Sequence, residues 1–337
     1  MRSDIRVRIL FAIATSPAIA QQAPIHVRVS LGDVSLNKVS FLIADDAGIY
    51  AKNGLDVQQL ITPAAAEAVR RNGVTVPARY VASSGDQAFE LGSSGGAPTI
   101  MGMISAGRPM DRVILATTDS EVRWKIFAKP GITSLAQLKG KRLGYSGVGT
   151  VSHYMALAFL KEIGWSPERD ITLVGNALSI DALKENRIDA VLADEIVQAL
   201  APAAGFHSVV DLRTYHIPLP GSGVVASRVW LRDNRDVAKR FMKATVESIA
   251  LMKQNSGVSS AAMAKWFGMT DPAKQHEVWL QSADLPRKPY PSAAGIAKLM
   301  ELYPSAEMAK HKPEDFYDDS FIRELDRSGF IDGLYRK

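Results

Sequence analysis

The 337-residue chain contains no cysteine. A disulfide framework, a lipid anchor on cysteine and a cysteine nucleophile are therefore all excluded. The sequence also lacks a G-x-S-x-G elbow, a phosphate-binding Walker loop and a histidine pair at metal-ligand spacing. These absences count against the common hydrolases, nucleotide hydrolases and metalloenzymes, and we expect no metal and no cofactor.

Aromatic residues make up only 7% of the chain, and the formal net charge is a modest +5. No clustered basic run with interleaved aromatic residues occurs, so we expect no nucleic-acid partner. The mild positive excess, which falls to +3 without the leader described next, weakly favours anionic ligands. We expect a monomer without stable membrane insertion.

The first twenty residues have the pattern of a cleavable signal peptide. Three arginines precede the apolar core 9–14, and Ala18-Ile19-Ala20 is a small-x-small cleavage site before Gln21. The apolar core is far shorter than the ~20 residues of a membrane span. A buried N-terminal helix is the alternative, but Pro17 would break it. Residues 1–20 therefore predict export to the periplasm.

Strand patterns alternate with helix patterns along the remaining chain. Strands are expected at 26–31, 55–61, 86–91, 112–117 and 142–145, and helices at 39–50, 98–106 and 151–163. This order predicts an α/β fold with parallel sheets. The length exceeds the ~250 to 300 residues that one core usually serves, so two lobes are expected.

Two turns between a strand and a helix are rich in Gly, Ser and Thr, at 92–96 and 146–150. The first amides of a helix lack partners and attract carboxylate, sulfonate or phosphate groups. Ser94 and Thr150 could equally be ordinary helix caps. Two such turns in separate lobes favour a ligand site between them.

Three stretches carry a resemblance to a known family. They are ADDAGIYAKNGLDV at 44–57, GITSLAQLKGKRLG at 131–144 and LKENRIDAV at 183–191. They are similar to the signatures of periplasmic solute-binding proteins of the sulfonate, nitrate and thiamine-precursor group, the SsuA/NMT1/THI5-like family. The similarity covers roughly residues 27 to 255.

The resemblance implies a type II periplasmic-binding-protein fold, with two α/β lobes joined by two crossover strands. Lobe I would comprise residues 27–117 and, with the C-terminal helices, 225–337; lobe II would comprise 118–224. The implied function is capture of a small anionic or zwitterionic organic solute in a cleft between the lobes. The solute, of sulfonate, carboxylate or pyrimidine type, would be delivered to the permease and ATPase of an ABC importer.

Lobe I departs from the family pattern between residues 65 and 84, so its contacts transfer less directly there. In lobe II, Asp194 and Glu195 follow a strand and could accept hydrogen bonds from an amine, although Glu195 could equally begin the next helix. The predicted ligand contacts are Phe41, Asp45, Ser93, Ser94, Gly95, Ser120, Ser146, Gly147, Thr150, Ser152, His153, Asp194, Glu195 and Ser222.

An enzyme is the alternative reading, because relatives on this fold include a pyrimidine synthase, decarboxylases and desulfinases. His153, beside the lobe II turn, would then be the general acid or base. No other catalytic motif is present, so the sequence favours a binding protein that is not an enzyme.

Overall fold

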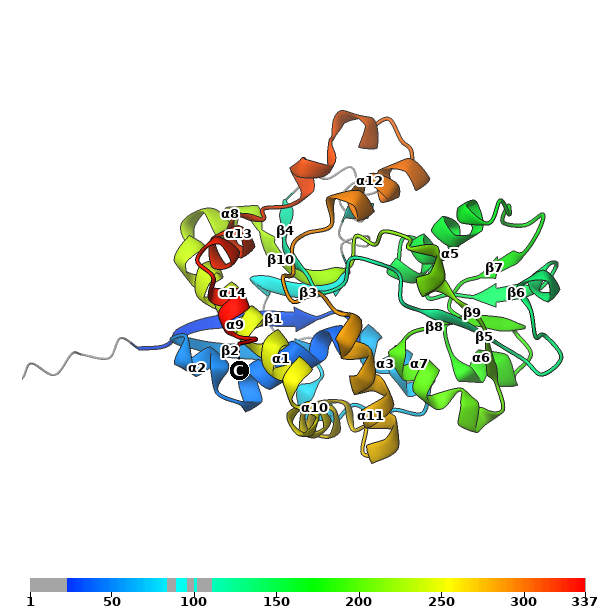
Figure 1. Ribbon diagram of the computed structural model, residues 1–337, viewed down its shortest axis with the longest axis horizontal. Helices are drawn as coiled ribbons and strands as arrows, with labels where there is room; N and C mark the ends of the chain where they lie inside the picture. The colour runs from blue at the N-terminus through cyan, green and yellow to red at the C-terminus, as the bar shows by residue number, and fades with distance from the viewer. Residues whose placement is uncertain (1–22, 84–88, 96–99, 102–110, 337) are drawn as a thin grey trace, which may run out of the picture.

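The computed structural model describes residues 23–83, 89–95, 100–101 and 111–336, and the predicted signal peptide lies outside them. The described chain contains two five-stranded sheets (Figure 1). The first has the order β2-β1-β3-β10-β4. Its strands are β1 (Ile25–Leu31), β2 (Leu55–Ile61), β3 (Leu91–Gly95), β4 (Arg112–Thr117) and β10 (Ser222–Ser227). In it β1 pairs in parallel with β2 and β3, whereas β10 is antiparallel to β3 and β4.

The second sheet, on the right of Figure 1, has the order β7-β6-β8-β5-β9. Its strands are β5 (Lys125–Ala128), β6 (Arg142–Gly144), β7 (Thr172–Val174), β8 (Ala190–Ala193) and β9 (His207–Asp211). Here β6 runs parallel to β7 and β8, and β5 is antiparallel to β8 and β9. The chain enters this sheet after β4 and returns to the first sheet at β10, where Ser222 already pairs with β3.

Helices cover both sheets. They are α1 (Leu36–Asp46), α2 (Ile49–Lys52), α3 (Pro63–Arg70), α5 (Val151–Glu162), α6 (Ile180–Lys184), α7 (Glu195–Leu200), α8 (Arg228–Asp233), α9 (Arg235–Gln254), α10 (Ser256–Ala262), α11 (Pro272–Leu280), α12 (Ala293–Leu302), α13 (Ser320–Arg327) and α14 (Phe330–Gly333). Helix α1 packs against α9, and their buried faces complete the core of the first sheet. No helix among the described residues is both long and apolar enough to cross a membrane.

The expected helix over 39–50 is two helices. Gly48 takes the left-handed conformation, with φ of 66°, and separates α1 from α2. An L side chain is disfavoured at such a φ, so glycine allows the chain to change direction here. Four strands expected from the sequence agree with the structure within one residue: 26–31 with β1, 55–61 with β2, 112–117 with β4 and 142–145 with β6.

The first Gly/Ser turn was predicted wrongly. Residues 92–95 belong to strand β3, which pairs with β1 on one side and β10 on the other. These two ladders satisfy the backbone groups of a segment whose glycines have low strand propensity. Of the expected strand 86–91 only Leu91 is in β3, and residues 84–88 lie outside the described chain. Of the expected helix 98–106 only Ile100 and Met101, both helical, are described.

The C-terminal segment contacts both sheets, since Phe321 and Ile331 lie in the core of the first sheet. Helix α12 packs against α5 of the second sheet, and Ile296 and Leu299 share a buried cluster with Phe159. Helix α11 similarly packs against α7. The C-terminal third therefore contacts the parts of the chain built on both sheets, as Figure 1 shows for α12.

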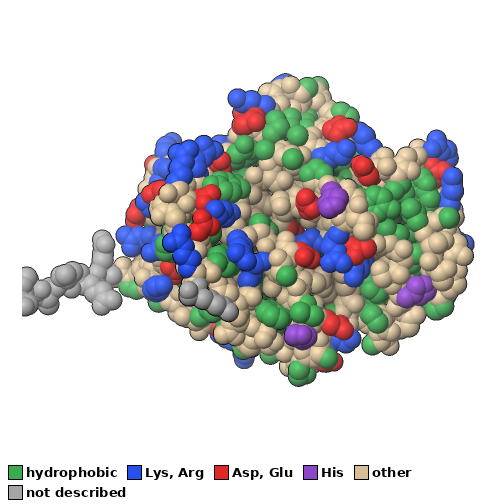
Figure 2. Space-filling view, in the orientation of Figure 1, with side chains coloured by type: hydrophobic (Ala, Val, Ile, Leu, Met, Phe, Trp, Pro, Cys, Tyr) green, Lys and Arg blue, Asp and Glu red, His purple; other side chains and the backbone are tan. Residues whose placement is uncertain are grey.

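Charged side chains of both signs interleave on the face shown in Figure 2. Around α8, α9 and α13 they form exposed ion pairs such as Arg235 with Asp318 at 3.0 Å and Lys239 with Glu324. Exposed pairs of this kind contribute little to stability. On this face, positive and negative side chains are therefore mixed.

Candidate functional site

The carboxyl edge of the first sheet gathers several polar groups. Gly32 and Asp33 follow β1, and Ser222 begins β10 opposite Gly95 at the end of β3. Helix α1 starts at the same edge. Open α/β sheets bind ligands outside the carboxyl ends of their strands, so this edge is a candidate binding surface.

The second sheet has a comparable edge. Gly144 of β6 pairs with Val191 of β8, so Ser146 and Asp194 follow neighbouring parallel strands at the same end. Helix α5 begins after the 146–150 turn, and α7 begins at Glu195. The carboxyl ends of the two strands therefore bring the turn and the acidic pair side by side.

Side chains from both sheets and from the connecting chain meet in a buried set that we call the junction cluster: Lys38, Asp119, Arg123, Glu195 and Ser222. Arg123 forms ion pairs with Glu195 at 2.6 Å and with Asp119 at 3.3 Å. Lys38 donates to the Ser222 hydroxyl at 3.2 Å. The Ser222 amide donates to Asp119 at 2.6 Å. The cluster links α1, the connection between β4 and β5, α7 and strand β10.

The junction cluster is electrically balanced and closed to solvent. Lys38 and Glu195 are 0% and 1% exposed, and two cations face two carboxylates. Outside the cluster, Lys38 also pairs with the partly exposed Asp33 at 2.9 Å. Removing one partner of such a buried pair leaves an uncompensated charge, which is strongly destabilising. The cluster therefore stabilises the arrangement of α1, α7 and β10 seen in this structure.

Burial and charge compete at Arg123 and Asp119. Burial acts to lower the pKa of Arg123, but the carboxylates of Glu195 and Asp119 outweigh it and raise this pKa. Burial raises the pKa of Asp119, and the positive charge of Arg123 opposes that rise. Arg123 is thus held charged as the centre of the cluster.

Asp194 begins α7 as its cap and accepts a hydrogen bond from the Val197 amide at 2.8 Å. Burial raises its pKa to about 7, and the carboxylates of Glu195 and Asp33 add to the rise. Asp33 lies after β1, so acidic groups of both sheet edges act on one another here. Glu195 is the first residue of α7, which was one of the two expectations for this residue. Its carboxylate forms an ion pair with Arg123, which was not expected.

The hydroxyls of the 146–152 segment bond to one another. Thr150 caps α5 by accepting from the His153 amide at 3.2 Å, and its own hydroxyl donates to the Gly147 carbonyl at 2.7 Å. Ser152 donates to the Ser146 hydroxyl at 2.9 Å. The Thr150 hydroxyl therefore caps α5, and its expected contact with a ligand stays a prediction. The amides that begin α5 are still presented at the sheet edge.

His153 lies between the second sheet and the C-terminal segment. Its Nδ1 atom is 2.8 Å from the Tyr303 hydroxyl, and its ring stacks on Tyr145 with centroids 5.0 Å apart. Burial lowers the pKa of His153, so the neutral imidazole is favoured at pH 7. This arrangement attaches α12 to α5.

Two predicted contacts lie away from both edges. Phe41 is 1% exposed and stacks on Phe241 of α9, with ring centroids 6.2 Å apart, because it lies on the buried face of α1. Asp45 lies in the last turn of α1, at the end opposite the sheet edge, where Lys265 is a nearby charge. Neither side chain can contact a solute at the junction.

The other predicted contacts are strand or connection residues. Ser93 is buried in β3, its hydroxyl has no hydrogen-bond partner within the described part of the chain, and its carbonyl accepts from the Gly32 amide at 2.9 Å. Ser94 and Gly95 pair with β10 through their backbones, and the structure does not describe the side chain of Ser94. Ser120 is exposed and its carbonyl accepts from the Leu219 amide at 2.8 Å.

Sequence reasoning missed Lys38, Asp119 and Arg123. A signal existed for Lys38, which interrupts the apolar pattern of α1 at a buried position. Asp119 and Arg123 stand four residues apart just after a buried strand, which is a second signal. Only the fold shows that these charges meet. Among the described residues, no group of three or more His, Asp or Glu side chains is placed to hold a metal ion.

A family model described as NMT1/THI5 like matches residues 35–256, about two thirds of the chain. The chain belongs to the NMT1/THI5-like family. No curated protein sequence matches this family member.

Solved structures agree with the fold of this NMT1/THI5-like protein. The nitrate-binding protein NrtA from Synechocystis PCC 6803 has a TM-score of 0.72 and 14% identity, covering 90% of this chain and 89% of its own. The aliphatic sulphonate binding protein SsuA from Escherichia coli has a TM-score of 0.62 and 18% identity, covering 88% and 99%. The desulfurization enzyme DSZB has a TM-score of 0.59 and 14% identity, covering 90% and 99%. The predicted α/β periplasmic-binding-protein fold is confirmed.

Proposed function

We propose that the protein is a periplasmic solute-binding protein that captures a small anionic or zwitterionic organic solute between its two sheets. The observation that carries this proposal is that Asp33, after β1, and Asp194, after β8, lie close enough at the two sheet edges to act on one another. A solute held there would contact both halves of the molecule. The family and the nitrate- and sulphonate-binding structures of the same fold support this role.

The charges at the two edges favour a zwitterion. Asp33 and Asp194 are close enough to raise the pKa of Asp194 together with Glu195, and an ammonium group on the solute would relieve that repulsion. The opening amides of α5 suit a sulfonate or carboxylate at the other end of the solute. An aminosulfonate such as taurine would use both features.

The proposal also includes export of the protein and delivery of its solute to a transporter. The leader at 1–20 supports a periplasmic location, and the family supports delivery of the solute to an ABC permease and its ATPase. N-terminal sequencing of the protein from a periplasmic extract should begin at Gln21. Protein that begins at Met1 would argue against the leader.

An affinity measurement on matched variants tests the solute site. Asp189 and Asp194 flank the same strand, β8, at opposite ends. A thermal-shift screen of taurine, alkanesulfonates, carboxylates, nitrate and pyrimidines should identify a ligand, since saturation at 100 times Kd stabilises by about 2.7 kcal/mol. Asp194→Asn should then weaken binding of an amine-bearing hit by about tenfold or more, whereas Asp189→Asn should not. Equal affinities for Asp194→Asn and the unmodified protein would refute this site.

The alternative is an enzyme on the same fold. The structural similarity to the desulfurization enzyme DSZB supports this alternative. His153 is the candidate acid or base, but its Nδ1 atom is engaged by Tyr303 and its pKa is lowered. We therefore favour binding without turnover. Mass spectrometry should recover the tightest ligand unchanged after incubation with oxygen, iron and common cofactors. A converted product that disappears in His153→Gln would favour the enzyme.

A further inference from the structure

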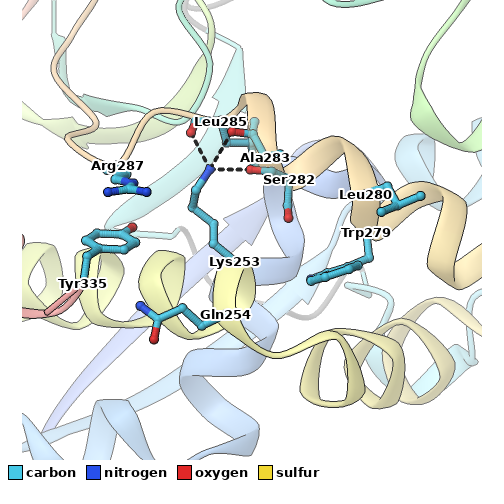
Figure 3. A pocket seen from close by; sticks show the side chains of 9 residues that line it. All are labelled: Lys253, Gln254, Trp279, Leu280, Ser282, Ala283, Leu285, Arg287 and Tyr335. Atoms are coloured by element: carbon cyan, nitrogen blue, oxygen red, sulfur yellow. Dashed lines mark hydrogen bonds between the residues drawn. The ribbon is translucent and has the colours of Figure 1, made fainter. Parts of the chain in front are cut away.

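A cavity of about 340 Å³ lies in the part of the chain built on the first sheet, at the C-terminal end of α9 (Figure 3). The junction cluster does not contribute to it. The residues that line it are Lys253, Gln254, Trp279, Leu280, Ser282, Ala283, Leu285, Arg287 and Tyr335. Its walls are therefore largely apolar and aromatic, with two cations.

The two cations have different roles. Lys253 donates to the carbonyls of Ser282, Ala283 and Leu285, which uses all three of its protons. It can therefore supply positive charge to the cavity but no further hydrogen bond. Burial, followed by the charge of Arg287, lowers the pKa of Lys253 to about 8.

Arg287 has unused donors. Its guanidinium lies over the Tyr335 ring, 4.6 Å from the centroid, and has no carboxylate partner within the described chain. The nearby acid Asp284 is taken by Arg213 at 3.4 Å. A stacked guanidinium keeps its planar fork available, and that fork matches a carboxylate. An anion between Arg287 and Lys253 would also relieve the repulsion between the two cations.

The Tyr335 hydroxyl is the second unused donor. Its oxygen is buried and has no hydrogen-bond partner in the described residues. Figure 3 shows the hydroxyl directed to the side where Lys253 and Arg287 lie. A buried hydroxyl without a partner is costly unless a ligand or water satisfies it. The side chain of Leu280, 54% exposed, extends the apolar wall to the surface.

We propose that this cavity is a second binding site, for a small organic carboxylate with an aromatic or branched apolar body. Arg287 binds the carboxylate with its fork, Tyr335 donates its hydroxyl to the same group, and Lys253 adds charge. Trp279, Leu280 and Leu285 contact the apolar body. Its lining residues are different from those at the edges of the two sheets.

Fluorine NMR with 4-fluorobenzoate tests the proposal on the full chain. The probe should bind, and 4-fluorobenzyl alcohol, which lacks the charge, should bind at least tenfold more weakly. Arg287→Gln should weaken the benzoate at least tenfold and Tyr335→Phe about two- to tenfold. Arg327→Gln, at an exposed arginine outside the cavity, should leave its affinity unchanged.

Two further measurements separate this site from the solute site. Asp194→Asn should leave benzoate binding intact, and Arg287→Gln should leave taurine binding intact. Because Arg287 is exposed, its replacement should not unfold the protein, which thermal melting would verify. Failure of the benzoate to bind, equal binding by Arg287→Gln, or displacement of the benzoate by taurine would each overturn the proposal.

Discussion

At the scale of single residues, this protein places charge where water cannot reach it. Arg123 and Glu195 are 6% and 1% exposed, and each depends on the other for neutralisation. Asp194 lies beside them with a pKa raised to about 7. The properties of these groups are set by their neighbours rather than by their own chemistry, so single substitutions should have large and specific effects.

Glu195→Gln keeps the shape of the side chain and removes the charge that balances Arg123. We expect the unfolding free energy to fall by about 3 kcal/mol, the lower end for a broken buried pair. Chemical denaturation would measure this. Glu185→Gln, at an exposed ion pair with Arg187, should have a small effect. Similar losses in the two variants would show that burial of the Glu195 pair is unimportant.

Asp194→Asn should change how stability depends on pH. The folded pKa near 7 lies above the ordinary aspartate value of about 3.9, so the unfolding free energy falls as pH rises through that interval. Asparagine can still cap α7 and does not titrate. The variant should therefore gain stability relative to the unmodified protein between pH 4 and pH 7, measured by denaturation across that range.

Asp189→Asn should change the pH dependence of stability in the opposite direction. Hydrogen bonds from Arg142 are the main cause that lowers the pKa of Asp189 to about 2. Its stabilising contribution is present above pH 4 and is lost as the pH falls towards 2. This variant should thus be less stable than the unmodified protein at neutral pH and equal to it near pH 2. Parallel pH profiles for the two aspartates would contradict both assignments.

At the scale of elements, helix starts organise the second sheet. Helices α5 and α7 begin at the same edge, and their caps Thr150 and Asp194 both bond to the first turn. The hydroxyl of Ser152 bonds to Ser146, which holds the turn to the helix. Each capped helix start places its first amides at the sheet edge, next to the proposed solute site.

Thr150→Val separates the cap from the ligand contact. Valine has the same shape but accepts no hydrogen bond, so we expect the unfolding free energy to fall by about 1 kcal/mol. Solute affinity should change little, because the Thr150 hydroxyl is already used by His153 and Gly147. Thr150→Ser should restore the stability. Loss of affinity with full stability would identify Thr150 as a solute contact after all.

At the scale of the whole molecule, the two sheets are joined by two chain crossings and by a few contacts at the junction. Besides the junction cluster, the Ile180 amide donates to Asn72 at 2.9 Å. Helices α11 and α12 add contacts from the C-terminal third. A buried apolar cluster that includes Ile114 and Val225 of the first sheet and Ile126 and Leu143 of the second also joins the sheets, so closure would be a hinge motion about the two crossings.

A saturating solute should close the molecule. Asp33 and Asp194 act on one another across the two edges, and an ammonium group between them would reduce their repulsion and allow a closer approach. Small-angle X-ray scattering should therefore give a smaller radius of gyration with the solute than without it. Asp194→Asn should show a smaller difference at the same solute concentration. Superimposable curves for the unmodified protein would argue against closure.

Local patterns along the sequence were enough to predict the alternation of strands and helices, the family and the turn before α5, because hydrophobic period and glycine position act locally. It misassigned residues 92–95, since two strand ladders outweigh the local propensity of glycine. Only the tertiary structure brought Lys38, Asp119 and Arg123 to Glu195, and only it buried Phe41 against Phe241. Contacts between distant residues depend on how the two sheets meet, which no local pattern encodes.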